Sequence, residues 1–203
     1  MKTVFEITLI SLAYLLGSIP FGYIFTKKFA GKNIQEFGSG NIGSTNVRRV
    51  AGYKVALLTQ LCDMMKGLLP IAAILLLRYY NVYVFDNYIL YIVALAAILG
   101  HNFSVFLNFK GGKGVNTTLG ASILLSPVTV LTSVLVYFFV KRISNYVSLG
   151  SICLAITLPV SEFILHSATL RFYYFVICSL LIIIMHLPNI VRLINGNEIK
   201  SKN

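Results

Sequence analysis

The stretch Val115–Val140, VNTTLGASILLSPVTVLTSVLVYFFV, is apolar over the length of a membrane span but carries a proline at position 127. About 20 apolar residues cross the hydrocarbon core as a helix, so the stretch suggests one span. Proline lacks a backbone N–H and clashes with the preceding turn, so Pro127 can break that helix. Two halves, about Val115–Leu125 and Val128–Val140, would each reach only about 17–20 Å and would return to the side they entered from.

The rest of the chain is equally apolar. Of its 203 residues, 57% are hydrophobic and only 11% are charged, which is typical of a polytopic membrane protein and not of a soluble domain. The sequence predicts a single polytopic membrane domain over residues 1–203. Besides the stretch around Pro127, the apolar segments are Val4–Thr26, Gly52–Arg78, Tyr88–Phe109, Val147–His166 and Leu170–Leu187.

The positions of the basic residues decide whether the fourth apolar segment is one span or is broken at Pro127. Lysine and arginine gather in cytoplasmic loops, and the loop from Lys27 to Lys54 is rich in both, so the N-terminus is expected outside. An unbroken fourth segment would put Lys141, Arg142 and the C-terminal tail outside, whereas a break at Pro127 returns them to the cytoplasm. The sequence therefore predicts an all-α integral membrane protein with seven transmembrane helical segments, its N-terminus outside and C-terminus cytoplasmic. Two of the seven are half-length helices around Pro127.

The net charge of +11 suits loops beside anionic lipid. Basic runs interleaved with aromatic residues, which would favour nucleic acid, are absent from the sequence. Cys62, Cys153 and Cys178 stand singly inside apolar segments, with no metal-binding spacing and no disulfide framework. We expect no metal and no cofactor.

Two glycine-rich loops carry the candidate chemistry. Lys110–Gly114, KGGKG, combines three glycines with two lysines, and glycine lets consecutive N–H groups turn toward one anion. It is not a nucleotide P-loop, because a glycine and not Ser or Thr follows Lys113. Gly38–Arg49, GSGNIGSTNVRR, adds hydroxyls, amides and an arginine pair that fits phosphate by two contacts. Each could be only a polar or flexible basic loop, but two such loops on one face favour an anion site built from both.

Several ionisable residues lie inside or at the ends of the apolar segments. Asp63 and Lys66 are three residues apart on one helix face, either as a functional pair or as a mutually neutralising one. Glu162 and His166 are expected at the outer membrane interface. His101 is interpreted as a helix cap.

Long ordered motifs give the chain a resemblance. Ser39–Arg49 is similar to SGN-x-GATN followed by arginine, Gly100–Thr117 to GH-x-x-PVF-x-x-FKGGKGVAT, and His186–Glu198 to H-x-x-NI-x-RL-x-x-G-x-E. Asp63–Gly67 and Tyr146–Ser151 also agree. The chain thus resembles the bacterial membrane glycerol-3-phosphate acyltransferases that use acyl-phosphate as donor. The departures are Ser44 and Asn116 in place of alanine and Ser104 in place of proline.

The resemblance implies a seven-helix enzyme of the bacterial inner membrane with its active site on the cytoplasmic face. Its reaction would move a fatty acyl group from acyl-phosphate to the 1-hydroxyl of glycerol 3-phosphate, giving lysophosphatidic acid and phosphate in the first committed step of phospholipid synthesis. The implied partners are these two substrates, membrane lipid and the soluble enzyme that makes acyl-phosphate; no nucleic acid is implied.

The resemblance also assigns residues to roles. Catalysis and the binding of glycerol 3-phosphate are assigned to Ser39, Arg49, Lys113, His186 and Asn189. Binding of the phosphoryl group of acyl-phosphate is assigned to Thr45, Asn46, Gly111 and Gly112. His186 is the candidate base, although a phosphate oxygen of the donor could accept the proton instead.

Two other classes of protein stay open on the sequence. A transporter or channel for a phosphorylated metabolite would also use broken helices and anion-binding loops, but it often shows internal repeats, which this sequence lacks. A non-catalytic membrane scaffold would not need so many donors converging on a small anion.

Overall fold

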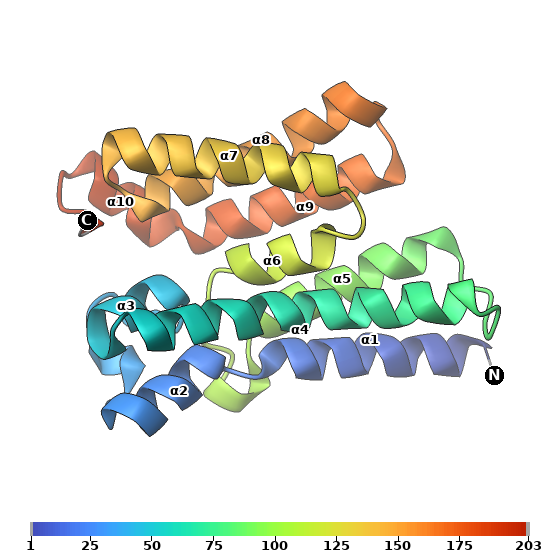
Figure 1. Ribbon diagram of the computed structural model, residues 1–203, viewed down its shortest axis with the longest axis horizontal. Helices are drawn as coiled ribbons and strands as arrows, with labels where there is room; N and C mark the ends of the chain where they lie inside the picture. The colour runs from blue at the N-terminus through green and yellow to red at the C-terminus, as the bar shows by residue number, and fades with distance from the viewer. Residues whose placement is uncertain (1, 202–203) are drawn as a thin grey trace. The chain divides into compact units, whose positions relative to one another are not determined.

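The computed structural model describes residues 2–201, which form helices and loops. The chain forms two compact units, unit 1 over Met1–Leu124 and unit 2 over Leu125–Asn203. Figure 1 shows the helices of both units. The expected single domain over residues 1–203 stays a prediction.

Unit 1 contains six α-helices and two short 3-10 turns in its described part. They are α1 (Lys2–Ser18), α2 (Phe21–Ala30), η1 (Ile34–Glu36), α3 (Ser44–Ala51), α4 (Tyr53–Tyr79), α5 (Asn87–Asn102), η2 (Val105–Leu107) and α6 (Val115–Ser122). The described part of unit 2 contains α7 (Pro127–Ser144), α8 (Val147–His166), α9 (Leu170–Met185) and α10 (Leu187–Ile194).

All seven predicted segments are helical. Within the described chain, five helical stretches are long and apolar enough to cross a membrane, and a sixth is obtained if α9 and α10, bent by 57°, count as one span. The remaining segment, α6, has 8 residues and a length of about 12 Å. The number of crossings and the sides of the two termini stay predictions.

The break at Pro127 is confirmed, but one of the two half-length helices is not. Pro127 is the first residue of α7, the position where its missing N–H costs least. α7 has 18 residues, about 27 Å, so it is long enough to cross the hydrocarbon core. The sequence estimate was wrong because it ended the helix at the first lysine, whereas the helix continues through Lys141 and Arg142 to Ser144.

In unit 1, α1 packs along α5 and α4 packs along α6. The approach of α4 to α6 depends on a glycine from each helix. A Cβ on Gly67 would lie 2.8 Å from the backbone N of Ala121, and a Cβ on Gly120 would lie 2.7 Å from the carbonyl carbon of Met64. Small residues let helices come this close in a membrane protein, and the contact fixes α6 against the longest helix of the unit.

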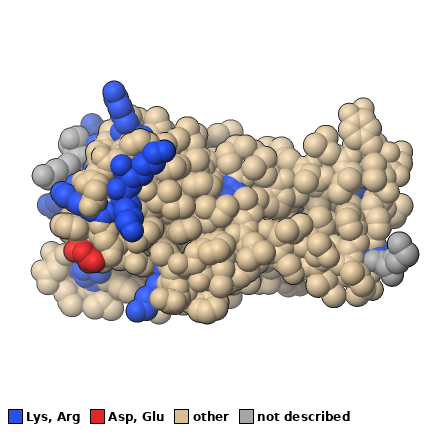
Figure 2. Space-filling model, turned by 90° about the horizontal axis from the view of Figure 1, so that it is seen from below, with Lys and Arg blue, Asp and Glu red and all other residues tan. Residues whose placement is uncertain are grey.

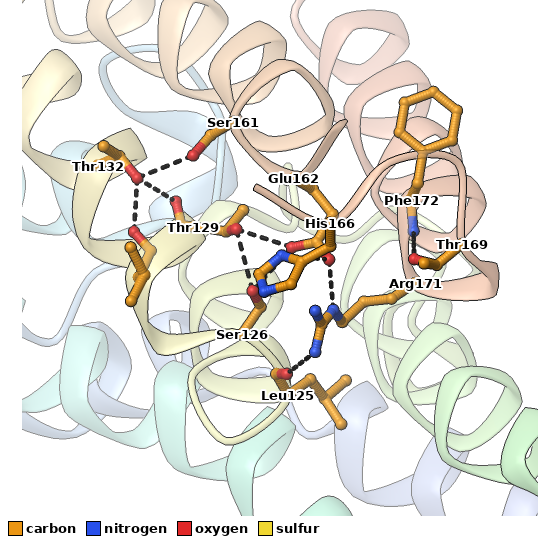
Figure 3. A network of polar contacts seen from close by, with 11 residues as sticks. Leu125, Ser126, Thr129, Thr132, Ser161, Glu162, His166, Thr169, Arg171 and Phe172 are labelled. Carbon is orange, nitrogen blue, oxygen red and sulfur yellow. Dashed lines mark hydrogen bonds and ion pairs between the residues drawn. The ribbon is translucent and has the colours of Figure 1, made fainter. Parts of the chain in front are cut away.

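In unit 2, α8 packs against both α7 and α9, and a polar network joins them at one end (Figure 3). Its centre is Glu162, whose side chain is 0% exposed. The Oε2 atom of Glu162 accepts hydrogen bonds from the hydroxyls of Ser126 and Thr129, each at 2.7 Å. Its Oε1 atom pairs with Arg171 Nε and lies 3.2 Å from His166 Nδ1.

This network gives the buried Glu162 partners from three helices, while its expected place at the outer membrane interface stays a prediction. Arg171 also donates to the carbonyl of Leu125 at 2.8 Å, so one ion pair holds the start of α7, the end of α8 and the start of α9. A buried carboxylate of this kind is stabilised by its partners and not by solvent. Ser126, a polar residue within the apolar stretch around Pro127, is the sequence feature that could have indicated such a partner.

Candidate active site

The two glycine-rich loops, the first over Gly38–Arg49 and the second over Lys110–Gly114, lie against each other in unit 1. Gln35 Nε2 lies 3.5 Å from the carbonyl of Lys110, and Asn116 Nδ2 donates to Ser44 Oγ at 3.3 Å. Leu107 packs against an apolar cluster under the first loop, made of Ile34, Ile42, Val47 and Ala56. The structure therefore brings together two sequence motifs that are some 60 residues apart.

Two helix N-termini meet between these loops. Ser44 is the first residue of α3 and Asn116 is the second residue of α6, so the bond between them joins the first turns of both helices. The N-cap residues are Gly43 and Gly114, and glycine has no side chain with which to cap the first N–H groups. The N-terminus of a helix carries a partial positive charge and attracts anions, so two adjacent ends without a capping side chain suit a phosphate.

Basic side chains reinforce this field. Figure 2 shows Lys and Arg gathered over the end of unit 1 that carries α2 and α3. The exposed ones in this part of the chain are Lys27, Lys28, Lys32, Arg48, Arg49 and Lys54. Lys113 is half-buried beside the start of α6, and Ser39 is exposed. Within residues 2–201, no three His, Cys, Asp or Glu side chains gather as metal ligands.

Asn46 has a different task from the one expected. Its side chain is 2% exposed and is engaged inside the first loop. The Oδ1 atom accepts from the Ser39 N–H at 3.0 Å, and Nδ2 donates to the carbonyls of Phe37 and Asn41 at 2.9 and 3.0 Å. These bonds use the amide to shape the loop, so we revise the predicted direct phosphate contact of Asn46. The neighbouring Thr45, half-buried in the first turn of α3, keeps its candidate role.

Gly111 and Gly112 also act differently from the expected backbone cradle. Gly111 N–H donates to the carbonyl of Asn102 at 3.1 Å, and Gly112 N–H donates to that of His101 at 2.9 Å. Glycine is required because the loop folds tightly onto the end of α5. A Cβ on Gly111 would lie 2.6 Å from the Asn102 carbonyl oxygen, and one on Gly112 would lie 2.7 Å from Cε1 of the His101 ring. The two glycines set the path of the loop, and their amides are used within it.

His186 lies at the bend between α9 and α10 of unit 2. It is 3% exposed, and its Nδ1 lies 2.8 Å from the carbonyl oxygen of Ile182. A carbonyl oxygen can only accept a hydrogen bond, so Nδ1 carries the proton and Nε2 is the basic nitrogen. The helix bend thus selects the tautomer that a general base at Nε2 needs.

Asn189 is buried one turn after His186 and is held by Glu198. Asn189 Nδ2 donates to Glu198 Oε1 at 2.7 Å, and Arg192 Nε donates to Glu198 Oε2 at 2.8 Å. Burial alone would raise the pKa of Glu198, but the hydrogen bonds from Asn189 and Arg192 outweigh it and hold that pKa below its ordinary value. Glu198 closes the motif that begins at His186, but its hydrogen bonds to Asn189 and Arg192 were not expected from the sequence.

The residues that depart from the quoted motifs are hydrogen-bonded. Ser44 and Asn116 bond to each other, as described above, and Ser104 Oγ donates to the carbonyl of Ser18 at 2.5 Å. The first bond ties two helix ends and the second ties the start of η2 to the end of α1. Both bonds therefore add contacts around the loops.

Comparison with known proteins gives a consistent result. The family model described as glycerol-3-phosphate acyltransferase matches residues 7–196. The glycerol-3-phosphate acyltransferase of Clostridium acetobutylicum is 41% identical over 190 residues, covering 93% of this chain and 96% of the relative. That of Syntrophotalea carbinolica is 41% identical over 201 residues, covering 98% and 99%.

Solved structures agree with the fold. The crystal structure of PlsY (YgiH), an integral membrane glycerol 3-phosphate acyltransferase, in its glycerol 3-phosphate form has a TM-score of 0.87 with this chain at 36% identity, covering 96% of this chain and 94% of that one. Its lysophosphatidic acid form has a TM-score of 0.84.

Proposed function

We propose that this membrane acyltransferase takes its acyl group from acyl-phosphate. The premise is that the chain belongs to the glycerol-3-phosphate acyltransferase family. The acceptor would be the 1-hydroxyl of sn-glycerol 3-phosphate, and the products lysophosphatidic acid and inorganic phosphate. The observation that carries the proposal is the meeting of two glycine-capped helix N-termini beside Lys113. Both proposed substrates bear a phosphate, and this region of unit 1 is suited to bind one.

In unit 1 the roles divide by position. The first turns of α3 and α6, with Thr45 and Lys113, would bind phosphoryl oxygens, while Gly111 and Gly112 keep the second loop in place. Ser39 and Arg49 would bind glycerol 3-phosphate together with Lys113, because arginine's planar fork matches phosphate geometry. Compared with the sequence prediction, Asn46 becomes a residue that shapes the loop. His186 and Asn189 of unit 2 are assigned to glycerol 3-phosphate by the motif resemblance alone.

The chemical step is a direct transfer. The 1-hydroxyl oxygen attacks the acyl carbonyl carbon, the bond from that carbon to the phosphate oxygen breaks, and phosphate leaves with the bonding electrons. His186 Nε2 accepts the hydroxyl proton, since its Nδ1 is already bonded to the Ile182 carbonyl. A phosphate oxygen of the donor is the alternative acceptor. Acyl-phosphate is already activated, so positioning and charge stabilisation supply the rate.

We further propose that the enzyme lies in the bacterial inner membrane as seven segments, with the N-terminus outside and the site facing the cytoplasm. That face would receive acyl-phosphate from the soluble enzyme that makes it. Single cysteines introduced near Arg142 and Ser144 in a cysteine-free background should resist an impermeant thiol reagent in intact cells. Ready labelling from outside would overturn this topology.

The test of the reaction is a comparison of donors. Purified protein should acylate glycerol 3-phosphate with acyl-phosphate and not with acyl-CoA or acyl-carrier protein. Lys113→Ala should weaken the binding of both substrates, because it leaves phosphate charge uncompensated. Lys110→Ala, which removes the other lysine of the same loop, is the matched control. Transfer from acyl-CoA with none from acyl-phosphate would contradict the proposed donor.

A further inference from the structure

An ion pair lies inside unit 1 between two residues to which the proposed function assigns no role. Lys66 Nζ and Asp63 Oδ1 are 2.8 Å apart on α4, with side chains 1% and 2% exposed. Ionisable groups within a membrane span are expensive, and a pair that only neutralised itself could be replaced by apolar residues. Each member, however, also reaches a second group outside α4.

Lys66 reaches the break between α1 and α2. Its Nζ donates to the carbonyl of Ile19 at 3.0 Å, directly before Pro20, and lies 5.7 Å from the centre of the Phe21 ring. From this break α2 runs toward the first loop, and a Cβ on Gly22 would lie 3.0 Å from the carbonyl carbon of Ile42. Lys66 thus holds the start of α2, the helix that leads toward the first loop.

Asp63 reaches the second loop through His101. His101 is 4% exposed and its Nδ1 lies 3.6 Å from Asp63 Oδ1; within residues 2–201 this buried nitrogen has no hydrogen-bond partner. The carbonyl of His101 accepts the N–H of Gly112 at 2.9 Å, and a Cβ added to that glycine would collide with the His101 ring. His101 was interpreted from the sequence as a cap, but its ring lies between α4 and the second loop.

We propose that Asp63, Lys66 and His101 are positioning residues that hold the two loops of unit 1 in register from inside the helix bundle. This inference rests on the proposed function, since the loops it aligns are the ones assigned to the phosphates. One turn of α4 serves both loops. Lys66 fixes the start of α2, which leads to the first loop, and Asp63 supports the second loop through His101. A hydrophobic pair could fill the same space but could not bond a carbonyl or face an imidazole nitrogen.

The test separates positioning from stability. The variants are Asp63→Asn, Lys66→Met, the double variant of both, His101→Leu and His101→Asn, with Gln60→Met as the control that removes an exposed polar side chain from the same helix. Each single variant should raise KM on the order of 10-fold to 100-fold in the folded fraction, because misplacement of about 1 Å has effects of this size. His101→Leu should raise mainly the KM for acyl-phosphate. His101→Asn keeps an N–H donor, so its KM should rise less.

The double variant is the decisive one. It removes both charges, so its unfolding temperature should recover toward the wild type, as expected for a buried pair removed together. Its KM values should stay raised, since neither Ile19 nor His101 is held. Recovery of both KM values to within about twofold would show a purely structural pair and overturn the proposal.

Binding of inorganic phosphate keeps this result separate from the proposed reaction. Phosphate should raise the unfolding temperature of the wild type and of Gln60→Met, and raise it much less in the positioning variants. If the wild type transferred no acyl group, the proposed function would fail, and phosphate binding would still decide the positioning role. Equal phosphate stabilisation in all variants would refute that role.

Discussion

Replacing Gly112 with alanine should damage the second loop by a collision whose size can be worked out. The new Cβ would lie 2.7 Å from Cε1 and 3.0 Å from Cδ2 of the His101 ring. Carbon atoms normally approach to about 3.5–4.0 Å, so the ring or the loop must move by roughly 1 Å. The ring has little room to move, because its other side faces Asp63 on α4.

Overpacking of this kind costs about 1–3 kcal/mol. If the cost falls on the bound form of the loop, KM for acyl-phosphate should rise roughly 5-fold to 150-fold, with a smaller change for glycerol 3-phosphate. Initial rates with both substrates varied would measure it. Gly31→Ala is the control, because Gly31 has a φ of 65° and no neighbour within 4 Å, so alanine there costs only about 1–2 kcal/mol of backbone strain.

A double-mutant cycle tests the physical cause. In a His101→Ala background the new Cβ has space, so Gly112→Ala should cost less than about threefold there. The same loss in both backgrounds would refute the collision and leave the role of Gly112 unexplained. Kinetics unchanged from the wild type would make the loop a mere linker.

Three further predictions concern unit 2. His186→Ala should lower kcat by about 10²–10⁴-fold if His186 is the base, whereas a raised KM for glycerol 3-phosphate alone would limit it to orienting that substrate. Glu162→Gln should lower the free energy of unfolding, followed in mixed detergent micelles, by about 3–5 kcal/mol, because it breaks a buried ion pair, whereas the exposed control Glu36→Gln should change it by less than ~0.5 kcal/mol. The lowered pKa of Glu198 means that its stabilisation is complete above the ordinary carboxyl value near 4.5 and is lost as the pH falls through the folded value. The unfolding temperature of the wild type should therefore exceed that of Glu198→Gln at pH 7, with a gap that closes only below about pH 4.5; a gap that instead opened at low pH would contradict the sign.

Short-range features were well predicted from the sequence. The break at Pro127 follows from the covalent structure of proline, and the Asp63–Lys66 pair follows from helical spacing; both are confirmed. The length of α7 was missed because lysine and arginine can extend a helix beyond the apolar core while their charged ends reach the interface. Spacing along the chain gives no information about such an end.

Residues whose partners are distant in sequence could not be assigned by pattern. Glu162 has the local sequence of an interfacial acid, and only its contacts with Ser126 and Arg171 make it a buried one. Asn46 is the opposite case, since its motif suggested a ligand contact and its bonds hold the loop instead. In both cases the chemical type was right and its partner was unknown, because a polar side chain can satisfy a ligand or its own backbone equally well.

The same ambiguity explains why the site combines exposed cations with buried polar residues that touch no solvent. A phosphate site on a mobile loop would lose affinity to the entropy of ordering that loop. Here the ordering is done in advance by Asn46 in the first loop and by the backbone bonds of Gly111 and Gly112 in the second. The exposed groups, such as Arg49, then need only neutralise the negative charge of the phosphate. Polar residues that look like ligands in the sequence are therefore needed in larger number than the ligand can contact, and in the first loop burial separates the supporting Asn46 from the proposed binding residue Arg49.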